Sequence, residues 1–255
     1  MNLKTPYSIL THSPCCLGGL FKRFDPTLVK ARTQLLLKNR FDPFVTKEGY
    51  KIENSQQLYC YWDLAWEAIV FRGGWPDKMG EKPVIIDIGA NYGTFGWLCR
   101  KRWPNATIIG FEPLPDLAEF CKRLSCYDEV YPVALSDSTG TATLFLDFSL
   151  GLTASLGGNS LLNYTSSQVK VETDKLDSFN LHPDFMKVDV DGGELKTIIG
   201  GFKTFTNCPL AVIECTGRQR HNTVAELLQK KCKKLYFLGG DYLFHDNCIN
   251  PRQHI

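Results

Sequence analysis

The chain of 255 residues carries 29 Lys and Arg against 27 Asp and Glu, so its formal net charge is only +2. This near balance gives no global reason to expect a nucleic acid as partner. No stretch approaches the about 18 apolar residues of a membrane span, and the first residues lack the apolar core of a signal peptide. We therefore expect a cytoplasmic protein with an N-terminal extension over residues 1–80 and one larger domain over residues 81–255.

The ten cysteines are scattered along the chain and include no C-x-x-C spacing. Without a signal peptide, this distribution favours free thiols over a disulfide framework. Cys99, Cys208 and Cys215 stand in apolar segments, where cysteine behaves as a small hydrophobic residue, and we expect them to be buried.

The N-terminal extension is predicted to be mostly helical. Asp25-Pro26 suits the start of a helix through Leu28–Lys38, because the acid caps the first turn and proline fits the first helical position. A second helix is predicted over Gln56–Phe71, where apolar residues occupy most sides of the helix and indicate that it is packed against other elements.

The stretch that follows residue 83 carries the clearest chemical signal. Val84–Ile88 is a short β-branched run that contains an acid near its end, and a glycine-spaced turn then leads into a helix predicted to begin near Thr94. Glycine lets the main chain approach a ligand closely, and a helix N-terminus presents unpaired N–H groups to a carboxylate or phosphate. This arrangement is typical of a nucleotide-type cofactor site. The residues expected to contact the cofactor here are Asp87, Gly89, Ala90, Asn91 and Gly93.

The spacing of this turn indicates which cofactor to expect. A dinucleotide fingerprint needs G-x-G-x-x-G around a pyrophosphate, whereas this turn reads Asp-x-Gly-x-Asn-x-Gly. A second β-rich run, Thr107–Phe111, ends at Glu112, where an acid can accept hydrogen bonds from both ribose hydroxyls of an adenosine. Adenosine without pyrophosphate points to S-adenosylmethionine rather than NAD.

Strands and helices alternate through the rest of the chain, which predicts a doubly wound, mostly parallel α/β sheet. Two further β runs, Thr141–Phe145 and Val169–Thr173, flank a Gly-, Ser- and Asn-rich loop from Ser149 to Ser167. A loop this long is more often functional than idle and can close over a bound acceptor, with a disordered hairpin tip as the alternative. The strands predicted for the main sheet are Val84–Ile88, Thr107–Phe111, Glu129–Val133, Phe185–Val188, Leu210–Glu214 and Lys234–Leu238.

A third segment, Phe185–Leu195, reads as a strand that ends in a cluster of acids and is followed by a helix. Together with Asp87–Gly93, the Glu112-Pro113 turn and the run Ala134-Leu135-Ser136-Asp137, it resembles the FkbM family of S-adenosylmethionine-dependent methyltransferases. The resemblance covers roughly residues 83–215. It implies a seven-stranded, Rossmann-like sheet with helices on both faces, and it implies that Pro113, Ala134 and Asp137 also contact the cofactor.

The chain departs from the family pattern at one place. The family usually shows Asp-Val-Glu-Gly-Ala-Glu, whereas this chain has Asp189-Val190-Asp191-Gly192-Gly193-Glu194. Asp191 is one methylene shorter than the usual glutamate, and Gly193 replaces an alanine. This difference bears on the acceptor side of the site rather than on the first two motifs.

Methyl transfer from a sulfonium is an in-line displacement, so the protein must align the acceptor and, for a hydroxyl, remove its proton. Asp189, at the carboxyl end of its strand, is the leading candidate for that base or for orienting the acceptor. Glu194 and Glu214 are further candidates, and Glu194 can alternatively complement the helix dipole. His221 is another candidate because the imidazole of histidine suits a base near neutral pH, with a solvated turn residue as the alternative.

The resemblance implies a hydroxyl of a sugar, glycan or small metabolite as acceptor, and residues 1–80 would then serve acceptor binding or packing rather than the cofactor. An RNA- or protein-directed methyltransferase and a cofactor-binding pseudoenzyme are the alternatives. No His, Asp or Glu spacing indicates a metal site. Several aromatic residues of the extension can stack on sugars, although core packing explains them equally well. They are Tyr59, Tyr61, Trp62, Trp66 and Trp75.

Overall fold

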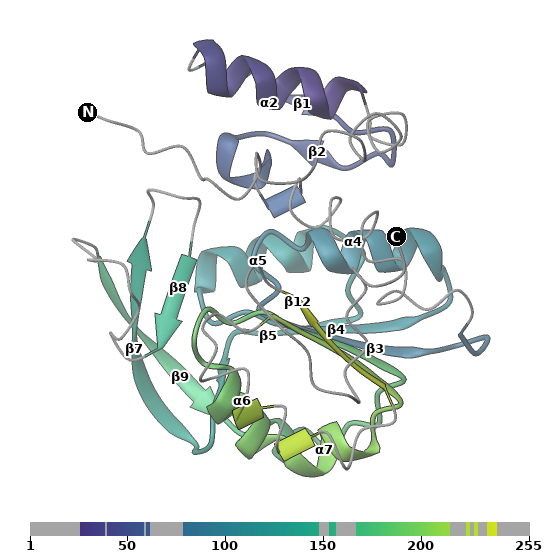
Figure 1. The fold of residues 1–255 in the computed structure, drawn as a ribbon, viewed down its shortest axis with the longest axis vertical. Coiled ribbons are helices and arrows are strands. Elements are labelled where there is room, and N and C mark those ends of the chain that lie inside the picture. The colour runs from purple at the N-terminus through teal and green to yellow at the C-terminus, as the bar shows by residue number, and fades with distance from the viewer. Residues whose placement is uncertain are drawn as a thin grey trace.

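The computed structural model describes residues 26–38, 40–58, 60–61, 79–147, 153–156, 167–214, 223–224, 227–228 and 234–238 (Figure 1). Some of the residues singled out above lie outside this part of the chain. They are His221, Cys215, Tyr59, Trp62, Trp66 and Trp75.

The centre of the molecule is a six-stranded sheet in which every neighbouring pair of strands is parallel, in the order β12-β11-β10-β3-β4-β5. Near-continuous apolar runs build it, as expected for strands that are buried on both faces. The predicted parallel α/β sheet is confirmed, with six strands in the described residues rather than seven. The strands are β3 (Val84–Ile88), β4 (Thr107–Phe111), β5 (Glu129–Tyr131), β10 (Phe185–Val188), β11 (Leu210–Glu214) and β12 (Lys234–Leu238).

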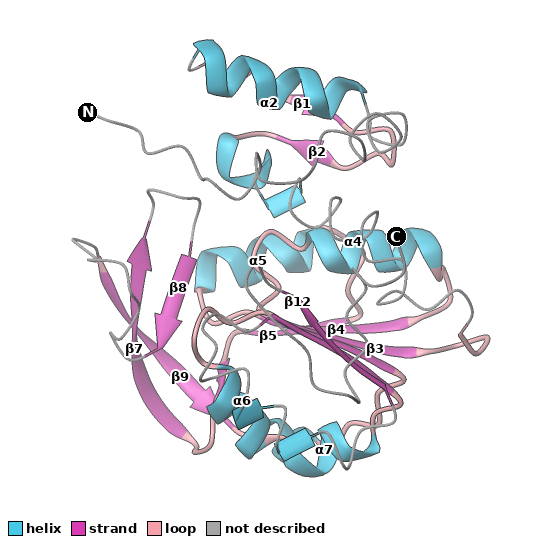
Figure 2. Cartoon of the chain, viewed as in Figure 1, coloured by secondary structure: helices cyan, strands magenta, loops and turns pink. Residues whose placement is uncertain are grey.

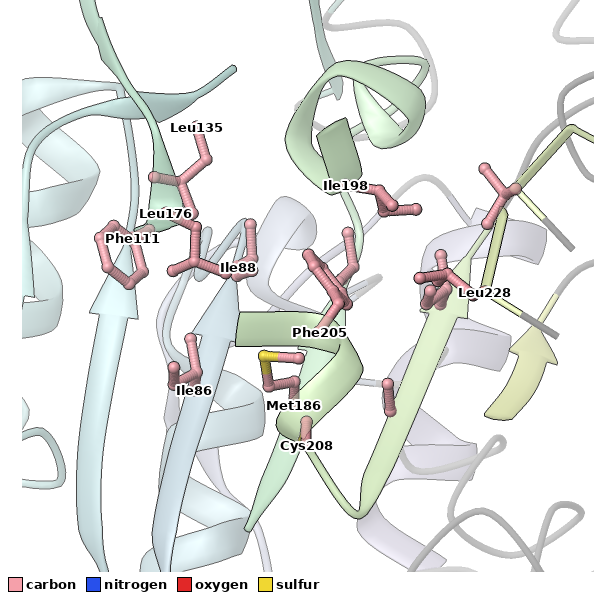
Figure 3. Close-up of a cluster of buried hydrophobic side chains, with 14 of the residues drawn as sticks. Ile86, Ile88, Phe111, Leu135, Leu176, Met186, Ile198, Phe205, Cys208 and Leu228 are labelled. Atoms are coloured by element: carbon pink, nitrogen blue, oxygen red, sulfur yellow. The ribbon is translucent and has the colours of Figure 1, made fainter. Parts of the chain in front are cut away.

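Helices cover both faces of this sheet, α4 (Thr94–Arg102) and α5 (Pro115–Arg123) on one and α6 (Glu194–Gly200) and α7 (Phe202–Asn207) on the other (Figure 1). Successive strand residues point to opposite faces. Ile85 therefore packs with Phe95 of α4, whereas Ile86 belongs to the cluster beneath α6 and α7. In that cluster Phe205 lies between the helices and the strands (Figure 3). Cys99 and Cys208 are buried free thiols, as predicted.

A second sheet of four strands flanks the first, in the order β6-β9-β7-β8 (Figure 1). Its antiparallel pair β7 (Gly140–Asp147) and β9 (Gln168–Asp174) extends the two predicted β runs. The prediction of a loop from Ser149 to Ser167 was wrong in part, because residues 153–156 within it form the strand β8 (Thr153–Leu156), which pairs with β7. The remaining strand is β6 (Ala134–Leu135).

The strand predicted over Glu129–Val133 ends two residues early. Pro132 follows Tyr131 directly and has no N–H to donate, so the ladder between β4 and β5 stops there. The chain then crosses to the second sheet, where Ala134 of β6 pairs with Thr173 of β9.

The described part of the N-terminal region combines helix and hairpin rather than helix alone (Figure 2). Helix α2 (Pro26–Lys38) matches the predicted helix, and residues 55–58 and 60–61 are helical where the second was predicted. Between them the short strands β1 (Phe44–Val45) and β2 (Lys51–Ile52) pair through a tight turn at Gly49, whose φ is +85°. Leu28, Tyr50, Leu58 and Tyr61 form its buried core.

Across the described residues, no helix combines the length and the apolar character that crossing a membrane requires.

Candidate functional site

The glycine turn, Glu112 and Asp189 all lie where the strand order of the main sheet reverses. In the main sheet, β4 and β5 lie on one side of β3, and β10, β11 and β12 lie on its other side. Helix α4, which follows β3, lies on the opposite face from α6, which follows β10 (Figure 1). In open α/β sheets such a divergence leaves a crevice at the carboxyl ends of the strands, and ligands bind there.

The turn after β3 is held by the neighbouring strands. The N–H groups of Gly89 and Ala90 both donate to the Phe111 carbonyl at the end of β4, over 3.0 and 3.1 Å. Gly89 has a φ of +79°, and a Cβ atom there would lie 1.9 Å from the Asp189 carbonyl oxygen. Position 89 therefore requires glycine because the backbone just after β10 lies so close. Any ligand that approaches this turn closely would add a second reason.

Glu112 is anchored directly to this turn. Its Oε2 accepts a hydrogen bond from the Asn91 N–H over 2.8 Å, and its Oε1 accepts one from the Leu114 N–H over 2.9 Å. Only 4% of the residue is exposed, and this burial raises the pKa of its carboxyl to about 7. Each carboxylate oxygen has a second lone pair, so Glu112 retains the capacity to accept hydrogen bonds from a ligand. Pro113, the next residue, is half-buried.

Asp87 lies beneath the turn and is completely buried. Its Oδ2 accepts a hydrogen bond from the Tyr127 hydroxyl over 2.5 Å, and its Oδ1 lies 4.0 Å from Nζ of Lys187. Burial raises the pKa of Asp87 to about 6, although Lys187 and Tyr127 oppose that shift. Because the side chain has no exposed surface, its influence on a ligand is electrostatic rather than by contact.

Lys187 was not identified from the sequence, although it joins the two sides of the site. Its Cα pairs with that of Asp87 across the β3–β10 ladder, and its Nζ donates to Oδ2 of Asp189 over 2.8 Å. A lysine with 7% exposure requires such charged partners. The available signal was its position inside the apolar run Phe185–Val188, where only a paired charge is tolerated.

Tyr127 was missed as well. Its half-buried ring fills the space that two glycines leave open, since a Cβ on Gly96 would lie 2.3 Å from the ring and one on Gly110 would lie 3.0 Å away. Gly96 belongs to α4 and Gly110 to β4, so the ring packs a helix against the sheet while its hydroxyl reaches Asp87.

The acids after β10 have different environments. The side chain of Asp189 is 33% exposed at the rim of the sheet, where its N–H donates to the Ile88 carbonyl. Glu194 is 1% exposed, and its Oε1 accepts a hydrogen bond from the Gly192 N–H over 2.7 Å. This contact gives Glu194 a local role in the turn before α6, which neither the catalytic prediction nor the helix-dipole alternative included. Asp191 and Gly192 both have positive φ, at +45° and +105°, so they form a tight left-handed turn.

The remaining predicted residues occupy separate places. Glu214 ends β11 next to β10 and is half-buried on the same rim as Asp189. Ala134 is buried in a cluster with Tyr92 of the glycine turn. Asp137 instead lies against the far end of α6, because a Cβ on Gly200 would meet its Cα at 3.3 Å. Within the described residues, no group of three or more His, Cys, Asp and Glu side chains has an arrangement that would hold a metal ion.

Comparisons with known proteins agree with this geometry. A family model described as the methyltransferase FkbM domain matches residues 87–236, which is more than half of the chain. The match begins at Asp87 and ends within β12, so it includes the glycine turn, Glu112 and the acids after β10. Comparisons with curated proteins and with solved structures give no match. The chain belongs to the FkbM methyltransferase family.

Proposed function

We propose that the protein transfers a methyl group from S-adenosylmethionine to a hydroxyl of a sugar, glycan or small metabolite. The observation that carries this proposal is the position of Glu112, a buried carboxylate fixed to the N–H of a glycine turn at the strand-order reversal. A carboxylate in that place suits the two hydroxyls of a ribose.

The charge balance around the turn supports a cationic cofactor. Among the described buried side chains, three acids, Asp87, Glu112 and Glu194, accompany a single basic residue, Lys187. S-adenosylmethionine carries a sulfonium and an ammonium group, which this excess of carboxylates would stabilise, whereas the pyrophosphate of NAD would be repelled. Residues 89–93 and Glu112 would hold the cofactor, which supplies an activated methyl group.

Asp189 is the residue that we propose to act on the acceptor. It stands on the same rim as the turn, and the ammonium group of Lys187 holds its Oδ2 in a charge-assisted hydrogen bond. The fixed carboxylate can orient an acceptor hydroxyl and accept its proton as the oxygen attacks the methyl group. Glu214, on the adjacent strand, is a second candidate for contact with the acceptor.

Binding of the cofactor can be tested by calorimetry with S-adenosylmethionine and with NAD. Glu112→Ala should weaken S-adenosylmethionine binding by about 1.5–3 kcal/mol, roughly 10- to 150-fold, because a charged hydrogen-bond acceptor is lost. Glu119→Ala is the matched control, since Glu119 is an exposed acid on the adjacent helix α5. Tight binding of NAD, or equal S-adenosylmethionine affinity in the two variants, would refute the assignment.

The acceptor can be sought with a labelled-methyl transfer screen over glycans and small hydroxylated metabolites, with RNA and peptides as comparison pools. Once an acceptor is found, Asp189→Asn should lower turnover by roughly 10²–10⁴-fold while cofactor affinity changes little. If Asp189→Asn turns over at a rate close to that of the wild type, Asp189 is not the base, and Glu214 and His221 become the candidates for that role. Cofactor binding without transfer to any pool would instead support the pseudoenzyme alternative, for which Asp191-Gly192-Gly193 is the distinguishing sequence.

A further inference from the structure

The N-terminal region makes two hydrogen bonds to the glycine turn. The Tyr50 hydroxyl donates to the Tyr92 carbonyl over 2.6 Å, and the Tyr92 hydroxyl donates to Oε1 of Gln56 over 2.8 Å. Tyr50 follows the β1–β2 turn and Gln56 belongs to the helical residues 55–58, so both partners come from outside the family-matched stretch. Figure 1 shows this region lying over α4 and α5.

Both tyrosines are positioned by extensive packing. Tyr50 is 1% exposed and stacks on Tyr61 at 5.3 Å between ring centroids, with the edge of Trp97 from α4 on its other side. Tyr92 packs edge-on against Phe120 of α5. Burial raises the pKa of the Tyr50 hydroxyl, which keeps it protonated as a hydrogen-bond donor.

The turn that these bonds reach contains a non-glycine residue in the left-handed region of the backbone. Asn91 has a φ of +49° and Gly93 one of +69°, and Tyr92 lies between them. A non-glycine residue in the left-handed region needs surrounding contacts to hold it there. Tyr50 supplies such a contact by donating a hydrogen bond to the Tyr92 carbonyl. The N–H of the preceding residue, Asn91, is the group that donates to Glu112.

We propose that Tyr50 and Gln56 are positioning residues of the cofactor site, acting through Tyr92 on the Asn91–Gly93 turn and on Glu112. This inference rests on the proposed function for the identity of the ligand. It replaces the expectation that residues 1–80 serve the acceptor or packing alone. If the contacts of the N-terminal region with Tyr92 favour cofactor binding, a bound cofactor must favour these contacts to the same extent, because such coupling is reciprocal.

A pair of tyrosine variants separates positioning from general stability. Tyr50→Phe removes the hydroxyl that reaches the turn. Tyr61→Phe removes a hydroxyl from the same buried cluster, but that hydroxyl bonds to Oε2 of Glu48 within the N-terminal region. Both variants keep the stacked rings. We expect S-adenosylhomocysteine to bind Tyr50→Phe roughly 5- to 30-fold more weakly, because a buried carbonyl loses its donor. Tyr61→Phe should bind within about twofold of the wild type.

Hydrogen exchange without ligand gives a readout that does not depend on the cofactor. The amides of Ala90 and Gly93, which bond to the Phe111 and Ala90 carbonyls, should exchange faster in Tyr50→Phe and remain unchanged in Tyr61→Phe. Gln56→Leu, which removes the acceptor for Tyr92, should resemble Tyr50→Phe. With S-adenosylhomocysteine bound to the wild type, amides of residues 44–58 should gain protection.

The outcomes are distinguishable. If the turn amides exchange equally in Tyr50→Phe and Tyr61→Phe, or if the two variants bind S-adenosylhomocysteine equally well, the inference is overturned. If the turn amides respond as expected but the wild type binds neither S-adenosylmethionine nor S-adenosylhomocysteine, the proposed function fails while the positioning of the turn stands.

Discussion

The two halves of the site differ in how firmly their acids are held. On the proposed cofactor side, Asp87 and Glu112 are almost entirely buried and bonded to a tyrosine or to main-chain N–H groups. On the proposed acceptor side, Asp189 and Glu214 stand partly exposed, next to the end of β10 and at the end of β11. Buried carboxylates fixed to the main chain suit a ligand that is the same in every reaction cycle. Exposed ones leave room for acceptors of different shape.

The two halves meet at two positions. Lys187 lies between Asp87 and Asp189, and Gly89 touches the Asp189 carbonyl oxygen. Changes at these positions should therefore affect both sides, whereas changes on one side alone should leave the other intact. The following predictions test that division, from the largest expected effect to the smallest.

Lys187→Met should have the largest effect on stability. It removes the cation between two carboxylates and leaves the buried Asp87 and the partly exposed Asp189 without that partner, at a cost of about 3–5 kcal/mol. Lys196→Met is the matched control, because Lys196 is exposed on α6. Urea unfolding of both variants measures the difference. A loss below about 1 kcal/mol for Lys187→Met would show that the pair contributes little and that the two halves are not joined through it.

Gly89→Ala should come next, at about 2–4 kcal/mol, since it combines a strained positive φ with displacement of the β10 backbone. Gly80→Ala, with nothing within 4 Å of its added Cβ, is the control. Thermal unfolding and S-adenosylmethionine calorimetry should show losses in stability and in affinity for Gly89→Ala only. Normal stability with lost affinity would mean that the ligand alone requires glycine here.

The pH dependence should distinguish the buried acids from the exposed ones. Folding raises the pKa of Asp87 to about 6 and that of Glu112 to about 7, so between about pH 4 and 7 the folded state binds more protons than the unfolded state. The free energy of unfolding without ligand should therefore fall by about 1–3 kcal/mol as pH rises through this window. Affinity for the cationic cofactor should rise over the same window, because both acids become ionised.

Glu112→Gln provides the control for the pH experiment. Stability and affinity should both depend less on pH in this variant, since one of the two titrating groups is gone. Wild-type stability that increases from pH 5 to 8 would contradict the expected direction, and would show that other groups dominate proton uptake.

Asp137→Ala should have the smallest effect. Asp137 is half-exposed and accepts hydrogen bonds only from its neighbours Ser136 and Ser138 among the described contacts, over 3.2 and 3.3 Å. We expect S-adenosylmethionine affinity to change by less than about twofold. A tenfold loss in calorimetry would place Asp137 on the cofactor side, as the family resemblance implied.

The sequence was sufficient for the strands and the main motifs because these are local. Val84–Ile88 and Thr107–Phe111 are short, mostly apolar runs followed by a glycine turn or an acid, and the structure has both strands with the predicted bounds. The family prediction is likewise confirmed by the match over residues 87–236. Pro132 also stands in the sequence, but the strand was predicted to continue through it to Val133, whereas β5 ends at Tyr131.

The contacts that organise the site could not be predicted, because they join residues distant in the chain. Lys187 reaches Asp87 across 100 positions, and Tyr50 reaches Tyr92 across 42. Nothing in the local pattern of either segment specifies its partner. The strand β8 was missed for a different reason, since the composition of residues 149–167 favours a loop and only pairing with β7 makes part of it a strand.

The ring of Tyr127 has a consequence for how this protein can change over evolutionary time. Tyr127, in the loop before β5, shares one volume with Gly96 of α4 and Gly110 of β4, so the sizes of these three residues are linked. A methyl group at Gly96 would lie 2.3 Å from the ring and becomes tolerable only after the ring has shrunk, whereas one at Gly110, at 3.0 Å, requires the ring to shift by a few tenths of an ångström. A smaller residue at 127 would in turn deprive Asp87 of its hydroxyl partner. Relatives of this chain should accordingly keep glycine at 96 wherever 127 is tyrosine, and should exchange the two together where it is not.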